Sequence, residues 1–313
     1  MKKILNFVVL FLFMLSLCIS TSCSAEIIDK PVERIVSGYY ISSSVCIALG
    51  LADEMVGIEA RADTRPVYGV AAPQLLDLPN VGTARDFNLE ACLALEPDLV
   101  ILPNRLRDVA DTLTEMGIYV ILVDPEGYDE IIDMIEQIGK ATNTESRAGQ
   151  LIAWYTQALE DLNTLTAGIQ NKPHVYISGV SSWLTTAPKD MYQSFLVEAA
   201  GGQNAASVLD GRGWVDISYE QLLSMNPEII IIPSEAGYDI GDIISDTALS
   251  QLSAVKNKTV YKMPYTYEAW DSPVPASMLG AFWMLGIFHG DLMHSIDVNQ
   301  ASADFYSEFY GIK

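Results

Sequence analysis

Histidine, cysteine and the short motifs of common catalytic sites are scarce or missing in this 313-residue chain. No GxGxxG, Walker A, HExxH, CxxC or GxSxG motif occurs, so the usual markers of nucleotide, zinc, redox and hydrolase sites are absent. No two of the three His have the spacing of metal ligands; they are His174, His289 and His294. We therefore expect no catalytic residue, no resident metal and no cofactor, and a protein that is not an enzyme.

Basic residues are also few. Eighteen Lys and Arg stand against 40 Asp and Glu, which gives a net charge of −22 at pH 7. Such acidity opposes binding to nucleic acid and to anionic bilayer surfaces, because both carry negative charge. We therefore expect no nucleic-acid partner. In so acidic a chain, an Arg near a pocket is a stronger candidate for a binding residue.

The first 23 residues have the pattern of an export signal. Lys2 and Lys3 precede an apolar run of about 16 residues, ILNFVVLFLFMLSLCI, which is too short for a comfortable membrane span. Small residues then lead to Cys23, and Ser22-Cys23 resembles a lipobox. We expect lipidation at Cys23, which would anchor the exported protein to the membrane, in the periplasm or at the cell surface. Plain cleavage after Ala25 is the alternative.

Two further cysteines, Cys46 and Cys92, lie in apolar segments with helical character. Export permits a disulfide between them. The interpretation that we favour is a pair of buried thiols acting as small apolar side chains.

One sequence pattern occurs twice, at an offset of 130 residues. Residues 88–103 read NLEACLALEPDLVILP and residues 218–233 read SYEQLLSMNPEIIIIP, with five identical positions. Each copy begins with a helix-capping candidate, Asn88 or Ser218, and continues with a short apolar helix, a Pro, four aliphatic residues and a second Pro. Such aliphatic runs are typical of parallel strands covered on both faces. The repeat predicts two similar α/β lobes.

Strands and helices alternate on both sides of one long helical segment. Residues 34–141 alternate strand and helix, which implies a mostly parallel sheet. Residues 145–166 contain no Pro and keep apolar residues at helical spacing, so we expect a single helix of about 22 residues there. We expect a leader at 1–23, an N-terminal lobe at 24–143, the connecting helix at 144–168 and a C-terminal lobe at 169–313. The segment SADFYSEFYGI is expected to form a last helix docked on the surface.

Aromatic and Arg side chains gather where the predicted strands end. In open α/β sheets, ligands bind beyond the carboxyl ends of the strands. Aromatic ring faces with a few cationic donors suit a sizeable anionic or polycyclic ligand. The predicted ligand-binding residues are Tyr39, Tyr40, Arg61, Arg65, Tyr68, Arg85, Arg105, Trp183, Trp214, Tyr267 and Trp270.

Three segments are distinctive in this order along the chain: ERIVSGYYISSSVCIALGLADEMVGI, LPNVGTARDFNLEACLALEPDLVIL and FLVEAAGGQNAA. Together they resemble the substrate-binding proteins of ABC importers for iron–siderophore complexes and vitamin B12. The resemblance covers nearly everything after the leader. It implies the class III binding-protein architecture, an α/β fold in which two Rossmann-like lobes with parallel sheets are joined by one long α-helix.

The resemblance also implies a function and partners. The protein would capture a metal chelate, either a ferric siderophore or a corrinoid, in the interlobe cleft and deliver it to a permease dimer with its ATPase subunits. In the family, a Glu on each lobe pairs with Arg of a permease subunit, and the matching positions here are Glu90 and Glu220. As first-turn acids, both also favour their helix dipoles. We expect a monomer.

Alternatives remain open for the ligand and for the class of protein. Haem or a molybdate-type oxyanion is the alternative ligand in the same fold. An exported enzyme with an interlobe active site is the alternative from another class.

Overall fold

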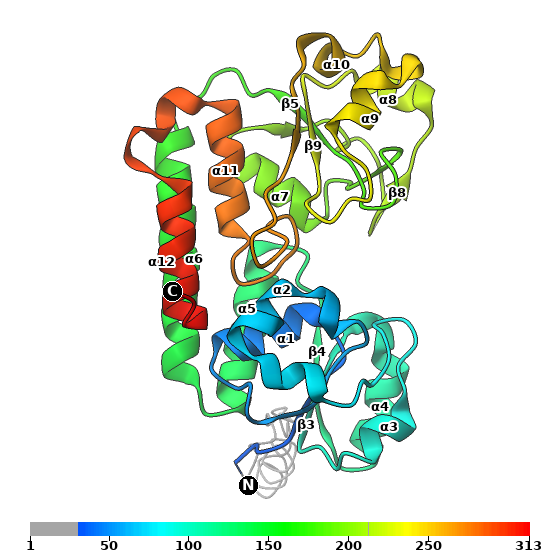
Figure 1. Cartoon of the computed structure of the whole chain (residues 1–313), viewed down its shortest axis with the longest axis vertical. Coiled ribbons are helices and arrows are strands. Elements are labelled where there is room, and N and C mark those ends of the chain that lie inside the picture. The colour runs from blue at the N-terminus through cyan, green and yellow to red at the C-terminus, as the bar shows by residue number, and fades with distance from the viewer. Residues whose placement is uncertain (1–30, 212) are drawn as a thin grey trace, which may run out of the picture. The chain divides into compact units, whose positions relative to one another are not determined.

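The computed structural model describes residues 31–211 and 213–313. The predicted export signal and its lipidation site Cys23 lie outside these residues. Residues 32–313 form one compact unit, which consists of two α/β lobes and the helices beside them (Figure 1). Within the described residues, no helix is both long and apolar enough to cross a membrane.

The N-terminal lobe contains a four-stranded parallel sheet with the order β2-β1-β3-β4. Every residue of the inner strand β3 is buried, as expected for a strand covered by helices on both faces. The strands are β1 (Ile35–Ser37), β2 (Met55–Gly57), β3 (Leu99–Pro103) and β4 (Tyr119–Val123). The helices are α1 (Tyr40–Ala48), α2 (Pro66–Ala71), α3 (Leu89–Leu93), α4 (Arg107–Glu115) and α5 (Tyr128–Ala141).

The C-terminal lobe contains a second parallel sheet with the order β7-β5-β9-β10. Its strands are β5 (His174–Ile177), β7 (Gln203–Asn204), β9 (Ile229–Ile232) and β10 (Val260–Lys262), and a small antiparallel pair is formed by β6 (Thr185–Thr186) and β8 (Val215–Asp216). The helices are α7 (Tyr192–Ala199), α8 (Tyr219–Met225), α9 (Ile240–Ser245), α10 (Ser253–Asn257) and α11 (Met278–Phe288). In both sheets the first strand lies between the second and the third, so the two lobes share one topology.

The repeated sequence pattern forms the same local structure in both lobes. Asn88 caps α3 by accepting a hydrogen bond from the backbone N–H of Ala91 at 3.0 Å. Ser218 caps α8 in a reciprocal capping box with Gln221. A left-handed residue follows each helix at the equivalent position, Glu96 at φ 46° and Asn226 at φ 40°, and the buried strands β3 and β9 come next. The prediction of two similar α/β lobes is confirmed.

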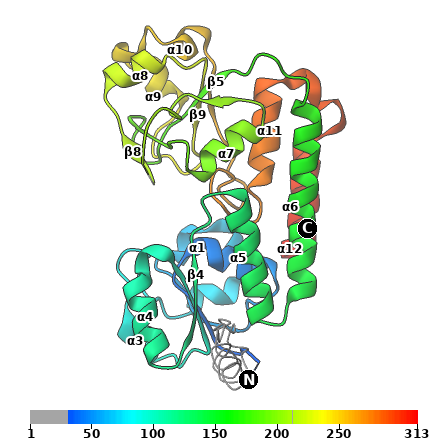
Figure 2. The same ribbon diagram turned by 180° about the vertical axis from the view of Figure 1, so that it is seen from behind.

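The predicted long helix is α6 (Glu145–Thr166), and it lies between the two sheets in the chain order. The domain boundaries drawn from the sequence stay a prediction. Helix α12 (Val298–Tyr310) lies alongside α6 in both views (Figure 1, Figure 2). The rings of Trp154 on α6 and Phe305 on α12 are 4.4 Å apart between centroids.

Helix α12 is more than a helix docked on the surface. It packs against α1 of the N-terminal lobe and α11 of the C-terminal lobe. Its aromatic side chains Phe305, Tyr306, Phe309 and Tyr310 are all buried. The Tyr310 hydroxyl donates to the carboxyl of Glu268 at 2.9 Å. The spacing of these rings along SADFYSEFYGI gives α12 a wide apolar face, and this face makes α12 a second connection between the lobes.

The two cysteines within the described residues, Cys46 and Cys92, are free and buried. Burial raises the pKa of the Cys46 thiol to about 12 and that of Cys92 to about 11. Both thiols therefore stay protonated at neutral pH and behave as small apolar side chains, which is the interpretation favoured from the sequence.

Replacing Glu268 by Gln is expected to remove part of the pH dependence of stability. Burial raises the pKa of Glu268 to about 7, so the folded state holds this proton more tightly than the unfolded chain does. The contribution of Glu268 to stability is therefore present at low pH and is lost as the pH rises through 7. Between about pH 5 and about pH 7.5, the wild type should lose on the order of 2 kcal/mol more unfolding free energy than Glu268→Gln.

Urea denaturation at the two pH values measures this difference. The control is Glu308→Gln, which removes an exposed carboxyl from the same helix α12 that holds Tyr310. Its pH dependence should match that of the wild type. A Glu268→Gln protein with an unchanged pH dependence would show that Glu268 does not hold a proton in the folded state.

Candidate functional site

A cavity of about 1390 Å³ lies between the two lobes. This is larger than the roughly 300–1,000 Å³ of ordinary small-molecule pockets. On the N-terminal side, Tyr39 follows β1, Arg105 follows β3 and Asp124 follows β4. On the C-terminal side, Val180 follows β5 and Glu235 follows β9. The cavity therefore occupies the carboxyl edges of both sheets, where ligands of open α/β sheets bind.

An ion pair joins the two walls of the cavity. Arg65, from the N-terminal lobe, donates through Nη1 to Oε1 of Glu235 in the C-terminal lobe at 2.7 Å. The guanidinium carbon of Arg65 lies 4.0 Å from the centroid of the Tyr40 ring. The two side chains are only 24% and 27% exposed, so water screens their attraction less than it screens a surface pair.

A buried carboxyl, Glu59, lies at the end of β2 and lines the cavity. Both its oxygens accept hydrogen bonds, from the Ser43 hydroxyl at 2.6 Å and from the Tyr68 hydroxyl at 2.8 Å. Burial raises the pKa of Glu59, and these two donors oppose the rise. Sequence reasoning missed Glu59 because it looked only for Arg and aromatic residues near the strand ends.

Seven of the eleven residues predicted to bind a ligand line the cavity. They come from loops of both lobes, and six of them belong to the N-terminal lobe. The seven are Tyr39, Tyr40, Arg61, Arg65, Arg85, Arg105 and Trp214. The structure brings them to one site, and their role in binding stays a proposal.

The other four predicted residues do not line this cavity. Tyr68 is fully buried behind Glu59, and Trp183 packs edge-on against Tyr238 at 5.3 Å in the core of the C-terminal lobe. Tyr267 and Trp270 line a separate cavity of about 580 Å³ beside α12. The indole N–H of Trp270 donates to the Tyr306 hydroxyl at 3.0 Å, so this loop sends its rings toward α12.

The same loop contributes Asp271 and Ser272 to the interlobe cavity instead. Asp271 is buried, and burial raises the pKa of its carboxyl to about 6. Its Oδ1 lies 3.4 Å from the Ser234 hydroxyl. The sequence offered one clue to this placement, a polar Asp271-Ser272 pair directly before a Pro in an otherwise apolar segment.

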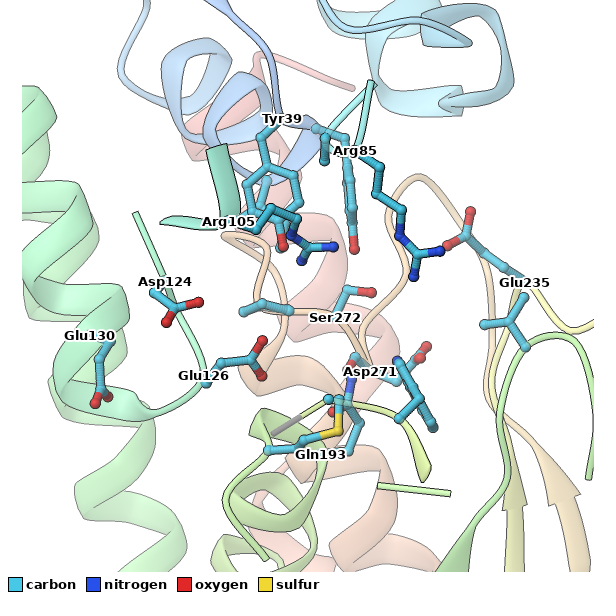
Figure 3. A pocket seen from close by; sticks show the side chains of 18 of the residues that line it. Tyr39, Arg85, Arg105, Asp124, Glu126, Glu130, Gln193, Glu235, Asp271 and Ser272 are labelled. Carbon is cyan, nitrogen blue, oxygen red and sulfur yellow. Dashed lines mark hydrogen bonds between the residues drawn. The ribbon is translucent and has the colours of Figure 1, made fainter. Parts of the chain in front are cut away.

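Among the described residues that line the cavity, acidic side chains outnumber basic ones by eight to five. Three of the acids, Asp124, Glu126 and Glu130, come from the loop and first turn after β4 (Figure 3). Burial also raises the pKa of Glu126. The eight acids are Glu59, Asp124, Glu126, Glu130, Asp190, Glu198, Glu235 and Asp271, and the five basic residues are Arg61, Arg65, Arg85, Arg105 and Lys189.

The described residues contain no group of three or more His, Cys, Asp or Glu arranged to hold a metal ion.

The two residues predicted to dock on a permease occupy equivalent places. Glu90 lies in the first turn of α3 and Glu220 in the first turn of α8, and both are exposed. In both views, α3 and α8 lie on the side of the unit away from α6 and α12 (Figure 1, Figure 2). The pKa of the Glu220 carboxyl is lowered by its own backbone N–H and by Ser218, so this side chain stays charged at neutral pH.

Known proteins share this fold and sequence. The molybdate-binding protein MolA of Haemophilus influenzae is 21% identical over 90% of this chain and 87% of its own. A structure of MolA bound to molybdate matches with a TM-score of 0.80 over 90% of this chain and 93% of that one, at 21% identity. The ABC transporter substrate-binding lipoprotein YvrC of Bacillus subtilis is 28% identical over 75% of this chain and 73% of its own. A vitamin B12-binding protein of Salmonella typhimurium is 30% identical over 54% of this chain and 64% of its own.

The model of the periplasmic binding protein family matches residues 35–267. This match covers more than half of the chain and both sheets, so the chain belongs to the periplasmic binding protein family. The architecture of two Rossmann-like lobes joined by a long helix, predicted from the sequence, is confirmed by the sheets, by α6 and by the solved relatives.

The Arg65–Glu235 ion pair is expected to be stronger than an ordinary surface pair. A double-mutant cycle with Arg65→Met, Glu235→Gln and the double variant measures the coupling in unfolding free energy. We expect about 1 kcal/mol or more, because both side chains are three-quarters buried. The matched control is the exposed pair Lys140–Glu136 on α5, for which about 0.3–0.5 kcal/mol is usual. Equal couplings would contradict a partly dehydrated pair between the lobes.

Proposed function

We propose that this chain is the extracytoplasmic substrate-binding component of an ABC importer, and that its ligand is a bulky metal chelate. A ferric siderophore and a corrinoid are the two ligand classes that fit. The observation that carries the proposal is the cavity of about 1390 Å³ between two lobes of a periplasmic binding protein. The named relatives include a vitamin B12-binding protein and an ABC transporter substrate-binding lipoprotein.

The size of the cavity favours a chelate over a bare oxyanion. A single tetrahedral oxyanion would leave most of this volume to water, whereas a large flat or globular chelate would displace it. The rings of Tyr39, Tyr40 and Trp214 offer apolar contact area, and Trp214 is 39% exposed. A molybdate-type oxyanion is one alternative ligand, because the relative MolA is a molybdate-binding protein. Haem is the other alternative ligand.

Binding without catalysis is the activity that the lining residues support. No His or Cys is among the described residues that line the cavity, so these residues offer neither an imidazole base nor a thiol nucleophile. We propose that the protein has no enzymatic activity.

The partner would be a permease dimer with its ATPase subunits. The exposed Glu90 and Glu220 occupy equivalent positions in two lobes of the same topology, which suits docking on a two-fold symmetric partner. We propose that the protein works as a monomer, anchored outside the cytoplasmic membrane through a lipid on Cys23.

Calorimetric titration tests the ligand. The purified protein should be titrated with a corrinoid, ferric siderophores, haem and molybdate under one set of conditions. We expect a corrinoid or a ferric siderophore to bind with a Kd of about 1 μM or tighter, near −8 kcal/mol. If molybdate is the one ligand that binds, the proposed ligand becomes an oxyanion and the chelate is rejected. Absence of binding by every ligand would overturn the proposed function.

Removing the two docking carboxylates tests the partner. In Glu90→Ala/Glu220→Ala, both changes lie on exposed helix turns outside the cavity, so the Kd for the ligand should not change. Uptake of that ligand by cells should fall about tenfold or more, because two charged contacts are lost together. The control is Glu115→Ala/Asp242→Ala, which removes one exposed acid from each lobe elsewhere. Normal uptake by the Glu90/Glu220 variant would refute the docking role.

A further inference from the structure

Gln193 carries a buried hydrogen-bond acceptor that has no partner. It lies in the first turn of α7, is 5% exposed and lines the cavity. Its Nε2 donates to the backbone carbonyl of Asp271 at 2.9 Å, and this bond fixes which way round the amide lies. Its Oε1 has no hydrogen-bond partner. A buried acceptor without a partner destabilises the folded protein, so a donor that arrives with the ligand would relieve this cost.

The groups around Gln193 are also acceptors. Asp271 is 3% exposed, and the carboxyl of Glu126 lies near the backbone N–H of Tyr192, the residue before Gln193, which lowers the pKa of Glu126 against the effect of burial. Figure 3 shows Glu126, Gln193 and Asp271 together in the lower part of the pocket. An amide oxygen and two carboxyls thus form one acceptor wall.

The cationic side chains of the cavity belong mostly to the N-terminal lobe, which also supplies Glu126. All four Arg come from loops of the N-terminal lobe, whereas the described residues of the C-terminal lobe contribute one Lys and four acids. One of the four Arg, Arg65, is already paired with Glu235. The C-terminal side of the cavity is therefore net negative, whereas the four Arg of the N-terminal side are balanced by four acids of the same lobe.

We propose that the acceptor wall of Glu126, Gln193 and Asp271 is a specificity subsite for a chelate that presents N–H donors and carries no net negative charge. This inference rests on the proposed function and names the chemistry of its ligand. Primary amides around a corrin ring and the ammonium group of a cationic hydroxamate chelate both have this chemistry.

Electrostatics gives the subsite its selectivity. A multiply anionic chelate, such as an iron tris-catecholate, would place its charge against the buried carboxyl of Asp271 and the half-buried carboxyl of Glu126, where the effective dielectric is lower than in water. Like charges in such contact cost several kcal/mol. A ligand with N–H donors would instead satisfy Oε1 of Gln193 and gain charge-assisted hydrogen bonds from the carboxyls.

Three probes separate the possible ligand chemistries: dicyanocobinamide, ferrioxamine B and ferric enterobactin. The first is neutral and amide-rich, the second cationic, and the third carries multiple negative charges. Calorimetry at one ionic strength should give a Kd for dicyanocobinamide or ferrioxamine B at least about 100-fold below that for ferric enterobactin. Which of the first two binds tells whether the donors come from a corrin rim or from a hydroxamate chelate.

Two isosteric variants, Asp271→Asn and Glu126→Gln, test the sign of the effect. Each removes one negative charge from the wall with little change in shape. Both variants should bind the favoured probe more weakly than the wild type does. Their binding of ferric enterobactin should be stronger than that of the wild type, or should stay undetectable. Glu198→Gln is the control, because it removes an exposed cavity carboxyl from the other end of α7, and it should have little effect. Thermal unfolding confirms that each variant is folded.

Gln193 itself is tested by a matched pair of variants. Gln193→Met and Gln193→Glu both lose the donor to Asp271, but only Gln193→Glu keeps an acceptor. We expect Gln193→Met to bind the favoured probe about tenfold more weakly than Gln193→Glu, which is the worth of one hydrogen bond.

The outcomes are distinguishable. Ferric enterobactin bound as tightly as the other probes, or any probe strengthened by both charge-removing variants, would overturn the subsite while leaving the chelate-binding function intact. Failure of every probe, together with failure of the other ligands named above, would overturn the proposed function itself.

Discussion

The packing of two helices, α6 and α12, sets the distance between the lobes, and the cavity depends on that distance. Trp154 and Phe305 hold the two helices together, and Tyr155 of α6 donates to the carbonyl of Val274 at 2.6 Å. Arg147 of α6 donates to the carbonyl of Ala48 in the N-terminal lobe at 3.1 Å. These contacts are buried or nearly so, and close-packed side chains resist deformation. The width of the cleft is therefore a property of the folded protein before any ligand enters.

Within that width, the balance of charge would decide which ligand the cavity accepts under the proposed function. Four Arg in an acidic protein invite the conclusion that the ligand is an anion. The structure argues against that simple conclusion, because Arg65 already has a carboxylate partner and, among the described residues, eight acids line the same cavity. The C-terminal side is net negative and the N-terminal side is balanced, so under the proposed function a ligand would be selected by where its charge lies as well as by its total charge.

The sequence was sufficient for the architecture. Asn88 and Ser218 marked helix starts, and the runs at 99–102 and 229–232 marked buried strands, because these signals are local. It also located the edge of the sheets that forms the cavity. It could not say which ring of a loop faces which side. Trp270 turned to Tyr306 on α12, 36 residues later in the chain, and no local pattern records such a partner. Gln193 and Asp271 were missed for the same reason, since their importance arises from contacts between distant segments.

The repetition of one helix–strand unit in both lobes has a consequence for how the molecule meets a symmetric partner. Helices α3 and α8 present an exposed Glu at the same turn of the same supersecondary unit. A partner with two identical halves would make nearly the same contacts with these two Glu after the molecule is rotated by half a turn. Docking would then have two acceptable orientations instead of one. A larger fraction of its encounters with the membrane complex would then be productive. The asymmetry of the ligand in the cleft would alone distinguish the two docked orientations.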